Sequence, residues 1–166
     1  MEKIINISEV NNIEIKIVSP SQDSVARLIA KLDRYQIALY GIENCNLEPS
    51  DTLMQNKAFM VGAFTSNLLI GIGAVKIVES YAEIKRMFVD PAFRKHGVAI
   101  KILKELEEYA IERQLENIYL ETGRLQFAAI ELYKKMGYVI VDQFGQYRPN
   151  SVSIYFQKRL KFKPIL

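Results

Sequence analysis

The sequence predicts a single α/β domain, residues 1–166, whose mixed and mostly antiparallel sheet is flanked by helices. A chain of 166 residues fits one domain and buries a sizeable core without disulfides or a structural metal. Its 49% apolar and 25% charged residues are typical of an ordinary globular protein. Segments with the two-residue period of strands alternate with segments that have the spacing of amphipathic helices, which indicates a mixed architecture.

The N-terminal third is expected to hold one strand, one helix and an irregular connection. Apolar and polar residues alternate over residues 13–17, which indicates a half-buried strand. Ser19-Pro20 ends this strand, and Ser21-Gln22-Asp23 offers a helix start. The apolar residues that follow at helical spacing are Val25, Leu28, Ile29 and Leu32. Gly41–Lys57 is polar and irregular, so we expect a loop with a short helix there.

Three antiparallel strands should come next. Ala58–Thr65 and Leu68–Val78 are predicted hairpin partners, with Ser66-Asn67 as the turn between them. Tyr81–Val89 is the third strand and ends at Asp90-Pro91, because proline cannot continue a central strand. The remaining predicted elements are a helix over about residues 97–113, a strand over Ile118–Glu121, a helix over Leu125–Met136, and closing strands at Tyr138–Val141 and Val152–Phe156.

Composition and charge argue against several classes of protein. The net charge of +3 is too small to indicate a nucleic-acid partner by itself. The single cysteine, Cys45, cannot form an intramolecular disulfide, which favours a reducing, cytoplasmic location. One histidine and one cysteine argue against a zinc site, and we expect no metal. Met1–Val10 lacks a signal-peptide pattern, and the longest apolar stretch, Leu68–Val75, is too short to span a bilayer.

The strongest chemical signal lies between a strand and a helix, over Val89–Ala99. A short basic loop opens directly onto the helix, whose first turn has unpaired backbone N–H groups and favours negative charge. Gly97 allows an anion to approach closely, and Ala99 keeps a nearby position small. Arg94 and Lys95 can neutralise a phosphate, so the loop suits a pyrophosphate. From the loop alone, a plain strand-to-helix turn with a basic, solvated face is an equal alternative.

Several motifs follow one another over residues 58–143. After a strand come Arg94-x-x-Gly97-x-Ala99, a long helix, Leu120-Glu121-Thr122, and Ala129-x-x-Leu132-Tyr133-x-x-x-Gly137-Tyr138. Their order resembles the GNAT superfamily of N-acetyltransferases. Three stretches look like a subgroup of small bacterial members: Glu83-Ile84-Lys85-Arg86-Met87, Leu120-Glu121-Thr122-Gly123 and Phe144-Gly145-x-Tyr147. Two positions depart from the usual pattern, which has glycine in place of Ala99 and asparagine in place of Gln126.

The resemblance implies a more specific fold and a co-substrate. Two central parallel strands, Glu83–Val89 and Ile118–Glu121, should splay apart and hold acetyl-CoA between them. Backbone groups of Met87 and Val89 would pair with its pantetheine arm, and the N–H of Met87 would polarise the thioester carbonyl. The residues expected to contact acetyl-CoA are Met87, Phe88, Val89, Arg94, Lys95, His96, Gly97, Val98, Ala99, Gln126 and Tyr133.

Direct transfer of an acetyl group to an amine needs a proton acceptor and a proton donor. An alkyl ammonium has a pKa of about 10.4, so a carboxylate or a chain of waters must take its proton. Glu83 lies where some family members place this base; its alternative is an ion pair with Lys85, two residues along the same strand face. The resemblance makes Tyr133 the acid that protonates the departing thiolate, and plain core packing is the alternative for this residue.

The acceptor side is less well specified. The candidates for contacting the acceptor, or for ending a strand or lying on the surface, are Lys85, Glu121, Thr122 and Tyr147. The basic residues that could hold a substrate carboxylate, or simply be solvated, are Arg86, Arg124 and Arg148. The leading function is an N-acetyltransferase acting on a small-molecule amine. The alternatives are a protein lysine or N-terminal acetyltransferase and a non-catalytic acyl-CoA sensor. We expect no nucleic-acid or membrane partner, and a homodimer stays open.

Overall fold

A computed structural model describes residues 12–162 of the chain. Its helices are α1 (Asp23–Tyr40), α2 (Ser50–Gln55), α3 (Val98–Glu112) and α4 (Phe127–Lys135), with short 3₁₀ turns η2 (Ile42–Asn44) and η3 (Pro91–Phe93). Its strands are β1 (Glu14–Ile17), β2 (Phe59–Thr65), β3 (Leu68–Val78), β4 (Tyr81–Val89), β5 (Asn117–Gly123), β6 (Val139–Val141) and β7 (Ser153–Arg159). Each helix and strand predicted above is present. The expectation for Met1–Val10 falls outside the described residues.

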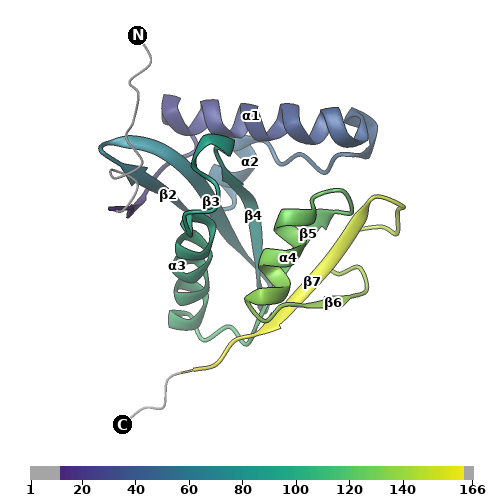
Figure 1. Ribbon diagram of the computed structural model, residues 1–166. Coiled ribbons are helices and arrows are strands. Elements are labelled where there is room, and N and C mark those ends of the chain that lie inside the picture. Colours follow the sequence, from purple (N-terminus) through teal and green to yellow (C-terminus); the bar gives the residue numbers. More distant parts are fainter. Residues whose placement is uncertain (1–11, 163–166) are drawn as a thin grey trace.

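The strands form one seven-stranded sheet in the order β1-β2-β3-β4-β5-β7-β6. Strands β4 and β5 are parallel neighbours, and the other neighbouring pairs are antiparallel. Helix α1 lies on one face of the sheet, and α3 and α4 lie on the other (Figure 1). The predicted mixed, mostly antiparallel sheet flanked by helices is therefore confirmed.

On each face of the sheet, a helix packs against the strands through a stripe of apolar residues. The buried residues of α1 are the four predicted from helical spacing, namely Val25, Leu28, Ile29 and Leu32. The buried apolar residues of α3 are Val98, Ile102, Leu103, Leu106 and Ala110. Fully burying an aliphatic side chain contributes about 1.5–3 kcal/mol. These two stripes therefore fix both helices against the sheet and hold the central strands from both sides.

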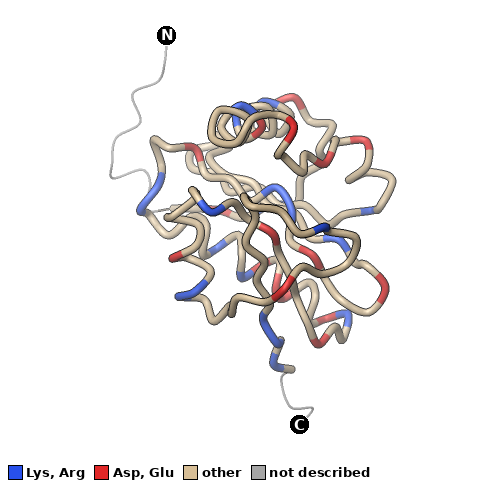
Figure 2. The backbone as a smooth tube through the Cα atoms, turned by 90° about the vertical axis from the view of Figure 1, so that its right-hand side faces the viewer, with Lys and Arg blue, Asp and Glu red and all other residues tan. Residues whose placement is uncertain are grey.

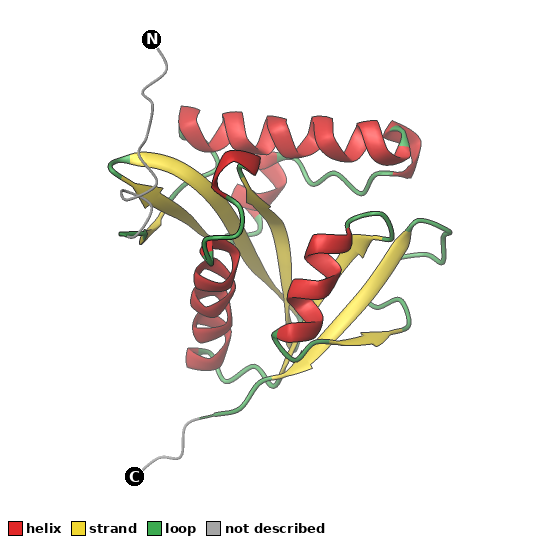
Figure 3. Ribbon diagram, in the orientation of Figure 1, coloured by secondary structure: helices red, strands yellow, loops and turns green. Residues whose placement is uncertain are grey.

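The central parallel strands pair over a short stretch, Ala82–Ile84 of β4 with Ile118–Leu120 of β5. Beyond it, β4 continues to Val89 and β5 continues to Gly123 without further pairing between them. Figure 3 shows the two strands diverging. Strand β5 instead pairs along its whole length with β7. The sheet therefore opens in its middle, as the resemblance predicts.

A β-bulge distorts β4 beside this opening. The register between β3 and β4 shifts around Gly73, which faces both Arg86 and Met87. Arg86 has a left-handed backbone conformation, with a φ of 57°. Because a bulge bends its strand and increases the local twist, it helps to turn the second half of β4 away from β5.

Several element boundaries differ from the prediction, and two of the differences have a clear local cause. Helix α4 begins at Phe127 rather than Leu125, because Gln126 closes a turn with Gly123 before the helix. In that turn the backbone N–H of Gln126 donates to the Gly123 carbonyl, and the Gln126 side chain accepts from the Gly123 N–H at 3.0 Å. Strand β7 continues to Arg159, beyond the predicted end at Phe156, because β5 supplies a pairing partner along that length.

Within residues 12–162, no helix is both long enough and apolar enough to cross a membrane. The same residues contain no group of His, Cys, Asp and Glu side chains placed to hold a metal ion. Figure 2 shows acidic and basic residues interspersed along the described chain. The net charge of +3 is therefore the small difference between interspersed basic and acidic residues.

Candidate active site

A cavity of about 70 Å³, which we call the central cavity, lies where β4 and β5 separate. Its walls come from α1, the segment between η2 and α2, β4, β5, α4 and the loop between β6 and β7. The predicted site residues that line it are Lys85, Met87, Glu121, Thr122, Gln126, Tyr133 and Tyr147. Glu83 lies instead in an adjoining open groove of about 1400 Å³, which we call the outer groove.

Tyr133 lines the central cavity from α4 and is 5% exposed. Its ring packs against Tyr138 and Phe156, with centroid separations of 5.7 and 5.9 Å. Burial raises the pKa of its phenol above the ordinary value of 10.0, and the nearby charge of Glu121 adds to the rise. The hydroxyl therefore keeps its proton at neutral pH. From the sequence, core packing is the alternative to an active-site role for Tyr133. In the structure, its ring packs in the core and also lines the central cavity.

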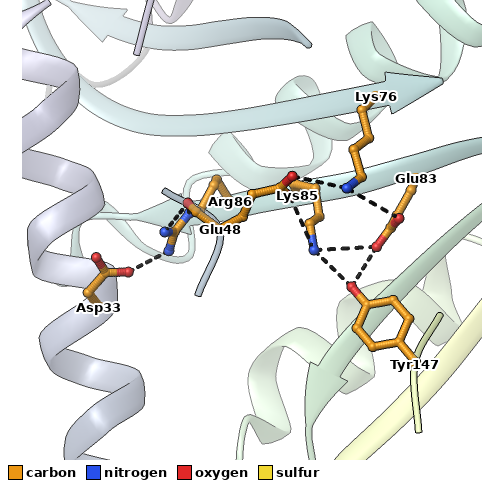
Figure 4. A network of polar contacts seen from close by, with 7 residues as sticks. All are labelled: Asp33, Glu48, Lys76, Glu83, Lys85, Arg86 and Tyr147. Atoms are coloured by element: carbon orange, nitrogen blue, oxygen red, sulfur yellow. Dashed lines mark hydrogen bonds and ion pairs between the residues drawn. The ribbon is translucent and has the colours of Figure 1, made fainter. Parts of the chain in front are cut away.

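Glu83 on β4 is 4% exposed and belongs to a network of charged side chains (Figure 4). Its Oε1 accepts a hydrogen bond from the Tyr147 hydroxyl at 2.5 Å. Lys85 Nζ lies 3.4 Å from the same oxygen, and Lys76 Nζ lies 3.9 Å from Oε2. The ion pair with Lys85, the alternative to a catalytic role, is therefore present. The role of Glu83 as a base stays a prediction.

Tyr147 reaches this network from the loop between β6 and β7. Its hydroxyl accepts a hydrogen bond from Lys85 Nζ at 2.8 Å while it donates to Glu83. Burial and the charge of Glu83 raise the pKa of the Tyr147 phenol, so this hydroxyl also stays protonated. Phe144 anchors the loop by packing on four aromatic rings, those of Tyr81, Tyr119, Tyr147 and Tyr155. Sequence spacing does not reveal this cluster, because its members come from three separate strands and a loop.

Glu121 faces the central cavity from β5. Its Oε1 accepts a hydrogen bond from Ser153 Oγ at 2.8 Å. Burial raises the pKa of this carboxyl group above its ordinary value of 4.5, although Ser153 and Lys85 oppose the rise. A carboxyl group with a raised pKa in the same cavity as Tyr133 is a candidate general base. From the sequence alone, Glu121 is only a candidate for contact with the acceptor.

Arg86 is not the solvated base that the sequence allows, since it lies at the bulge and is 9% exposed. Its Nε and Nη2 donate to the Glu48 carbonyl at 3.1 and 2.5 Å, and Nη1 pairs with Asp33 of α1 (Figure 4). Its guanidinium is therefore engaged and unavailable to a substrate carboxylate. Glu48 is 7% exposed and lies between Lys76 and Lys85. No sequence motif singles out Glu48, because it lies in an irregular segment.

The loop before α3 provides an open surface for an anion. Gly97 has a φ of 74°, and a side chain built there would meet nothing within 4 Å. Lys95 and His96 are exposed beside it. Arg94 is exposed as well, although its Nε donates to the Val89 carbonyl at 3.1 Å. Basic side chains and the exposed N-terminus of α3 therefore lie next to each other, as an anion-binding site requires.

Several other predicted acetyl-CoA contacts can involve backbone groups only. Phe88 buries its side chain on the α1 side of the sheet, and Val98 buries its side chain on the α3 side. The first N–H groups of α3, which include that of Ala99, lack partners within the helix. Met87 lines the central cavity, and β4 has no pairing with β5 beyond Ile84. This arrangement fits a long ligand that adds to a strand edge and carries phosphate groups.

Comparison with known families identifies the fold. A family model described as the Acetyltransferase (GNAT) family matches residues 27–138. The chain belongs to this family. The match spans the loop before α3, and it spans β4, β5 and α4, which are among the elements that line the central cavity. The resemblance seen in the motifs is therefore confirmed.

Relatives of this GNAT protein include enzymes and solved structures. An IAA acetyltransferase from Azospirillum brasilense is 36% identical over 151 residues, which cover 90% of this chain and 99% of the relative. A crystal structure from Klebsiella pneumoniae, described as a candidate acyl-CoA N-acyltransferase, has a TM-score of 0.77 and 29% identity, over 91% of this chain and 99% of that chain. A candidate streptothricin acetyltransferase from Bacillus anthracis, in complex with acetyl coenzyme A, has a TM-score of 0.55 and 28% identity, over 61% and 62% of the two chains. Acetyl-CoA-dependent acetyl transfer is the reaction that these relatives support.

Proposed function

We propose that this GNAT acetyltransferase moves an acetyl group from acetyl-CoA directly to the primary amine of a small molecule. The observation that carries the proposal is a protonated tyrosine, Tyr133, in a cavity formed where two parallel strands separate. The central cavity holds about 70 Å³, a size suited to the reacting ends of two substrates. The Azospirillum relative, which this chain matches over 99% of its length, is an acetyltransferase and supports the transfer of an acetyl group.

The binding of acetyl-CoA is assigned to backbone groups and to the basic loop. The exposed loop at Arg94–Gly97 and the first turn of α3 would bind its phosphates. The free edge of β4 would pair with the pantetheine arm, and the Met87 N–H would polarise the thioester carbonyl. Acetyl-CoA supplies the activated acyl group. The chain supplies position, polarisation and proton transfer.

Tyr133 is the proposed general acid. Its raised pKa keeps the hydroxyl protonated, so it can donate a hydrogen bond to the CoA sulfur as negative charge develops there. Thiols have a pKa of about 8.5 in water, so a thiolate is a weaker base than a phenolate, but the burial that disfavours the phenolate also disfavours a free thiolate in the same cavity. Packing of the ring against Tyr138 and Phe156 would hold the hydroxyl in place without a large motion.

Two carboxyl groups are proposed for the removal of the amine proton. Glu83 is the assignment based on family position, and Tyr147, Lys85 and Lys76 surround it. Glu121 is the second candidate, because it lines the same cavity as Tyr133 and its pKa is raised. Replacing each with glutamine distinguishes them. The variant that lacks the true base should lose the decline of kcat/KM toward acidic pH, together with most of its activity.

The proposed function is tested by a screen for release of free CoA thiol from acetyl-CoA, in the presence of small primary amines and of lysine-containing peptides. Turnover with a small amine is the expected result. Faster turnover with peptides would support the protein acetyltransferase alternative instead. Binding of acetyl-CoA without turnover on any amine or peptide would support the non-catalytic sensor and contradict the proposal.

A further inference from the structure

The central cavity and the outer groove meet at a junction. Four residues line both spaces: Asn46, Glu48, Lys85 and Tyr147. The walls of the outer groove come from the segment before α2, from β3 and β4, and from the loop between β6 and β7. An acceptor that approaches Tyr133 from the outer groove must therefore pass these four side chains.

Glu48 is the acidic residue at this junction. It is 7% exposed, and its Oε1 accepts a hydrogen bond from Lys76 Nζ at 3.0 Å. Its Oε2 is buried and forms no hydrogen bond, although Lys85 Nζ lies 3.3 Å away as an ion-pair neighbour. Buried carboxylate oxygens normally have a hydrogen-bond donor. This oxygen therefore keeps a free capacity to accept a hydrogen bond at the point where the two spaces join.

The main-chain position of Glu48 is held by contacts that do not involve its carboxylate. Arg86 holds the segment by donating two hydrogen bonds to the Glu48 main-chain carbonyl, and it pairs with Asp33 of α1 (Figure 4). The clamp therefore fixes the backbone, while the carboxylate contacts Lys76 and Lys85 at the junction. A change of the side chain at this position leaves all of these clamp contacts in place.

We propose that Glu48 is the binding residue for the acceptor, and that its Oε2 accepts a hydrogen bond from the acceptor's ammonium group at the entrance to the central cavity. This inference rests on the proposed N-acetyltransferase function. It assigns the acceptor to the class of primary amines that enter as cations without a carboxylate beside the nitrogen. The amine then passes on to the carboxyl groups that remove its proton.

Lys85 can release Glu48 without losing its own partners. Its Nζ donates to the Tyr147 hydroxyl at 2.8 Å and lies 3.4 Å from Glu83 Oε1. The contact with Glu48 Oε2, at 3.3 Å, is longer than a charge-assisted hydrogen bond of about 2.7–2.9 Å. An incoming ammonium therefore replaces a loose ion-pair contact by an aligned hydrogen bond, while Lys85 stays neutralised by Glu83.

The charges at the junction also determine which charged groups an acceptor can have next to its nitrogen. Glu48 and Glu83 balance Lys76 and Lys85 within the network, and Glu121 lies beyond them in the cavity. A carboxylate next to the acceptor nitrogen would lie against Glu48 and would have to displace it from Lys85. An ammonium group without that carboxylate avoids the repulsion from Glu48, so acceptors of this kind are favoured.

The test measures amine binding by calorimetry on the whole chain saturated with CoA, which cannot donate an acetyl group. The probes are phenethylamine and butylamine, each compared with its carboxylated counterpart, phenylalanine and norvaline. The variants are Glu48→Gln and, as a matched control, Glu43→Gln, which changes an exposed acid on the outer groove. The wild type should prefer each amine to its counterpart. Glu48→Gln should weaken amine binding by about tenfold or more, with unchanged affinity for CoA, whereas Glu43→Gln should bind normally.

Equal amine binding by wild type and Glu48→Gln would overturn the inference, as would a wild-type preference for the carboxylated probes or no binding of either amine. If Glu48→Gln does not fold, the wild type alone decides, since phenethylamine must bind at least about tenfold more tightly than uncharged 2-phenylethanol. Failure of the proposed function looks different. In that case amines bind through Glu48, but no thiol is released from acetyl-CoA.

Discussion

The hydroxyl of Tyr133 is the single side-chain group on which turnover should depend most. Tyr133→Phe keeps the ring that packs on Tyr138 and Phe156, so folding and affinity for acetyl-CoA should be preserved. Turnover should fall by about 10²–10⁴-fold, the usual contribution of general acid catalysis, if departure of the thiolate limits the rate. Steady-state kinetics with an acetylated amine measure this. Tyr109→Phe, whose ring stacks on Phe59 outside the central cavity, should behave as wild type. Normal kcat in Tyr133→Phe under those conditions would remove the acid role.

The raised pKa of Glu121 should make the stability of the protein depend on pH. Burial raises the pKa of its carboxyl group in the folded protein above the unfolded value of about 4.3. Its stabilising contribution is therefore fully present below pH 4 and is lost as pH rises through the folded pKa. Glu121→Gln removes this dependence, so its melting temperature relative to wild type should increase from pH 4 to pH 7. Glu131→Gln, at an exposed position on α4, should show no such trend. A difference that is independent of pH would contradict the raised pKa.

At the scale of elements, the loop before α3 should decide phosphate binding. Gly97→Val places a bulky side chain on the open surface where the phosphates should bind, so most of the acetyl-CoA-induced rise in melting temperature should disappear. The left-handed backbone also makes the variant less stable by about 1–2 kcal/mol. Gly137→Val carries similar strain, at a φ of 90°, but lies at the end of α4. It should lose stability and keep the acetyl-CoA-induced rise. A full rise in Gly97→Val would show that the phosphates bind elsewhere.

The loop between β6 and β7 should depend on the packing of Phe144. Phe144→Ala removes a half-buried ring that contacts four others and should cost about 1–3 kcal/mol, less than the 3–5 kcal/mol of a full core position. Because the loop carries Tyr147 to Lys85 and Glu83, the KM for the acceptor should rise more than the KM for acetyl-CoA. Denaturation and two-substrate kinetics measure both effects. Phe162→Ala, at an exposed position, is the control. Equal rises in both KM values would separate the loop from acceptor binding.

Local elements follow closely from sequence, and contacts between distant segments do not. The bounds of β3 and β4 match the alternation of apolar residues and the stop at Asp90-Pro91, and the α1 stripe matches its helical spacing. Period and turn chemistry are local signals, so they identify these elements. The place of β7 between β5 and β6 depends on long-range pairing, which has no local signal.

The same distinction applies to the candidate site. Tyr133, Glu121 and Gly97 lie in motifs that the sequence displays, and the structure brings the first two into one cavity. The burial of Arg86 and the junction at Glu48 result from contacts that join α1, β4 and an irregular segment. Such contacts depend on tertiary packing, so residue type alone misassigns Arg86 to the solvent.

At the scale of the whole molecule, one opening in the sheet organises the proposed site. The bulge at Arg86 and the short pairing of β4 with β5 create the central cavity, and α3 begins where the loop from β4 ends. The two halves of the sheet thus provide different parts of one site. The first half supplies the strand edge and the anion loop, and the second half supplies Glu121 and Tyr133.

Amide hydrogen exchange with and without acetyl-CoA tests most directly whether acetyl-CoA binds between β4 and β5. Binding in the opening should protect backbone amides in two stretches, the second half of β4 near Met87 and the loop and first turn of α3 over residues 94–100. The edge strands β1 and β6, far from the opening in the sheet order, should exchange as before. Protection confined to other segments, or none at saturating acetyl-CoA, would contradict the placement of acetyl-CoA between β4 and β5.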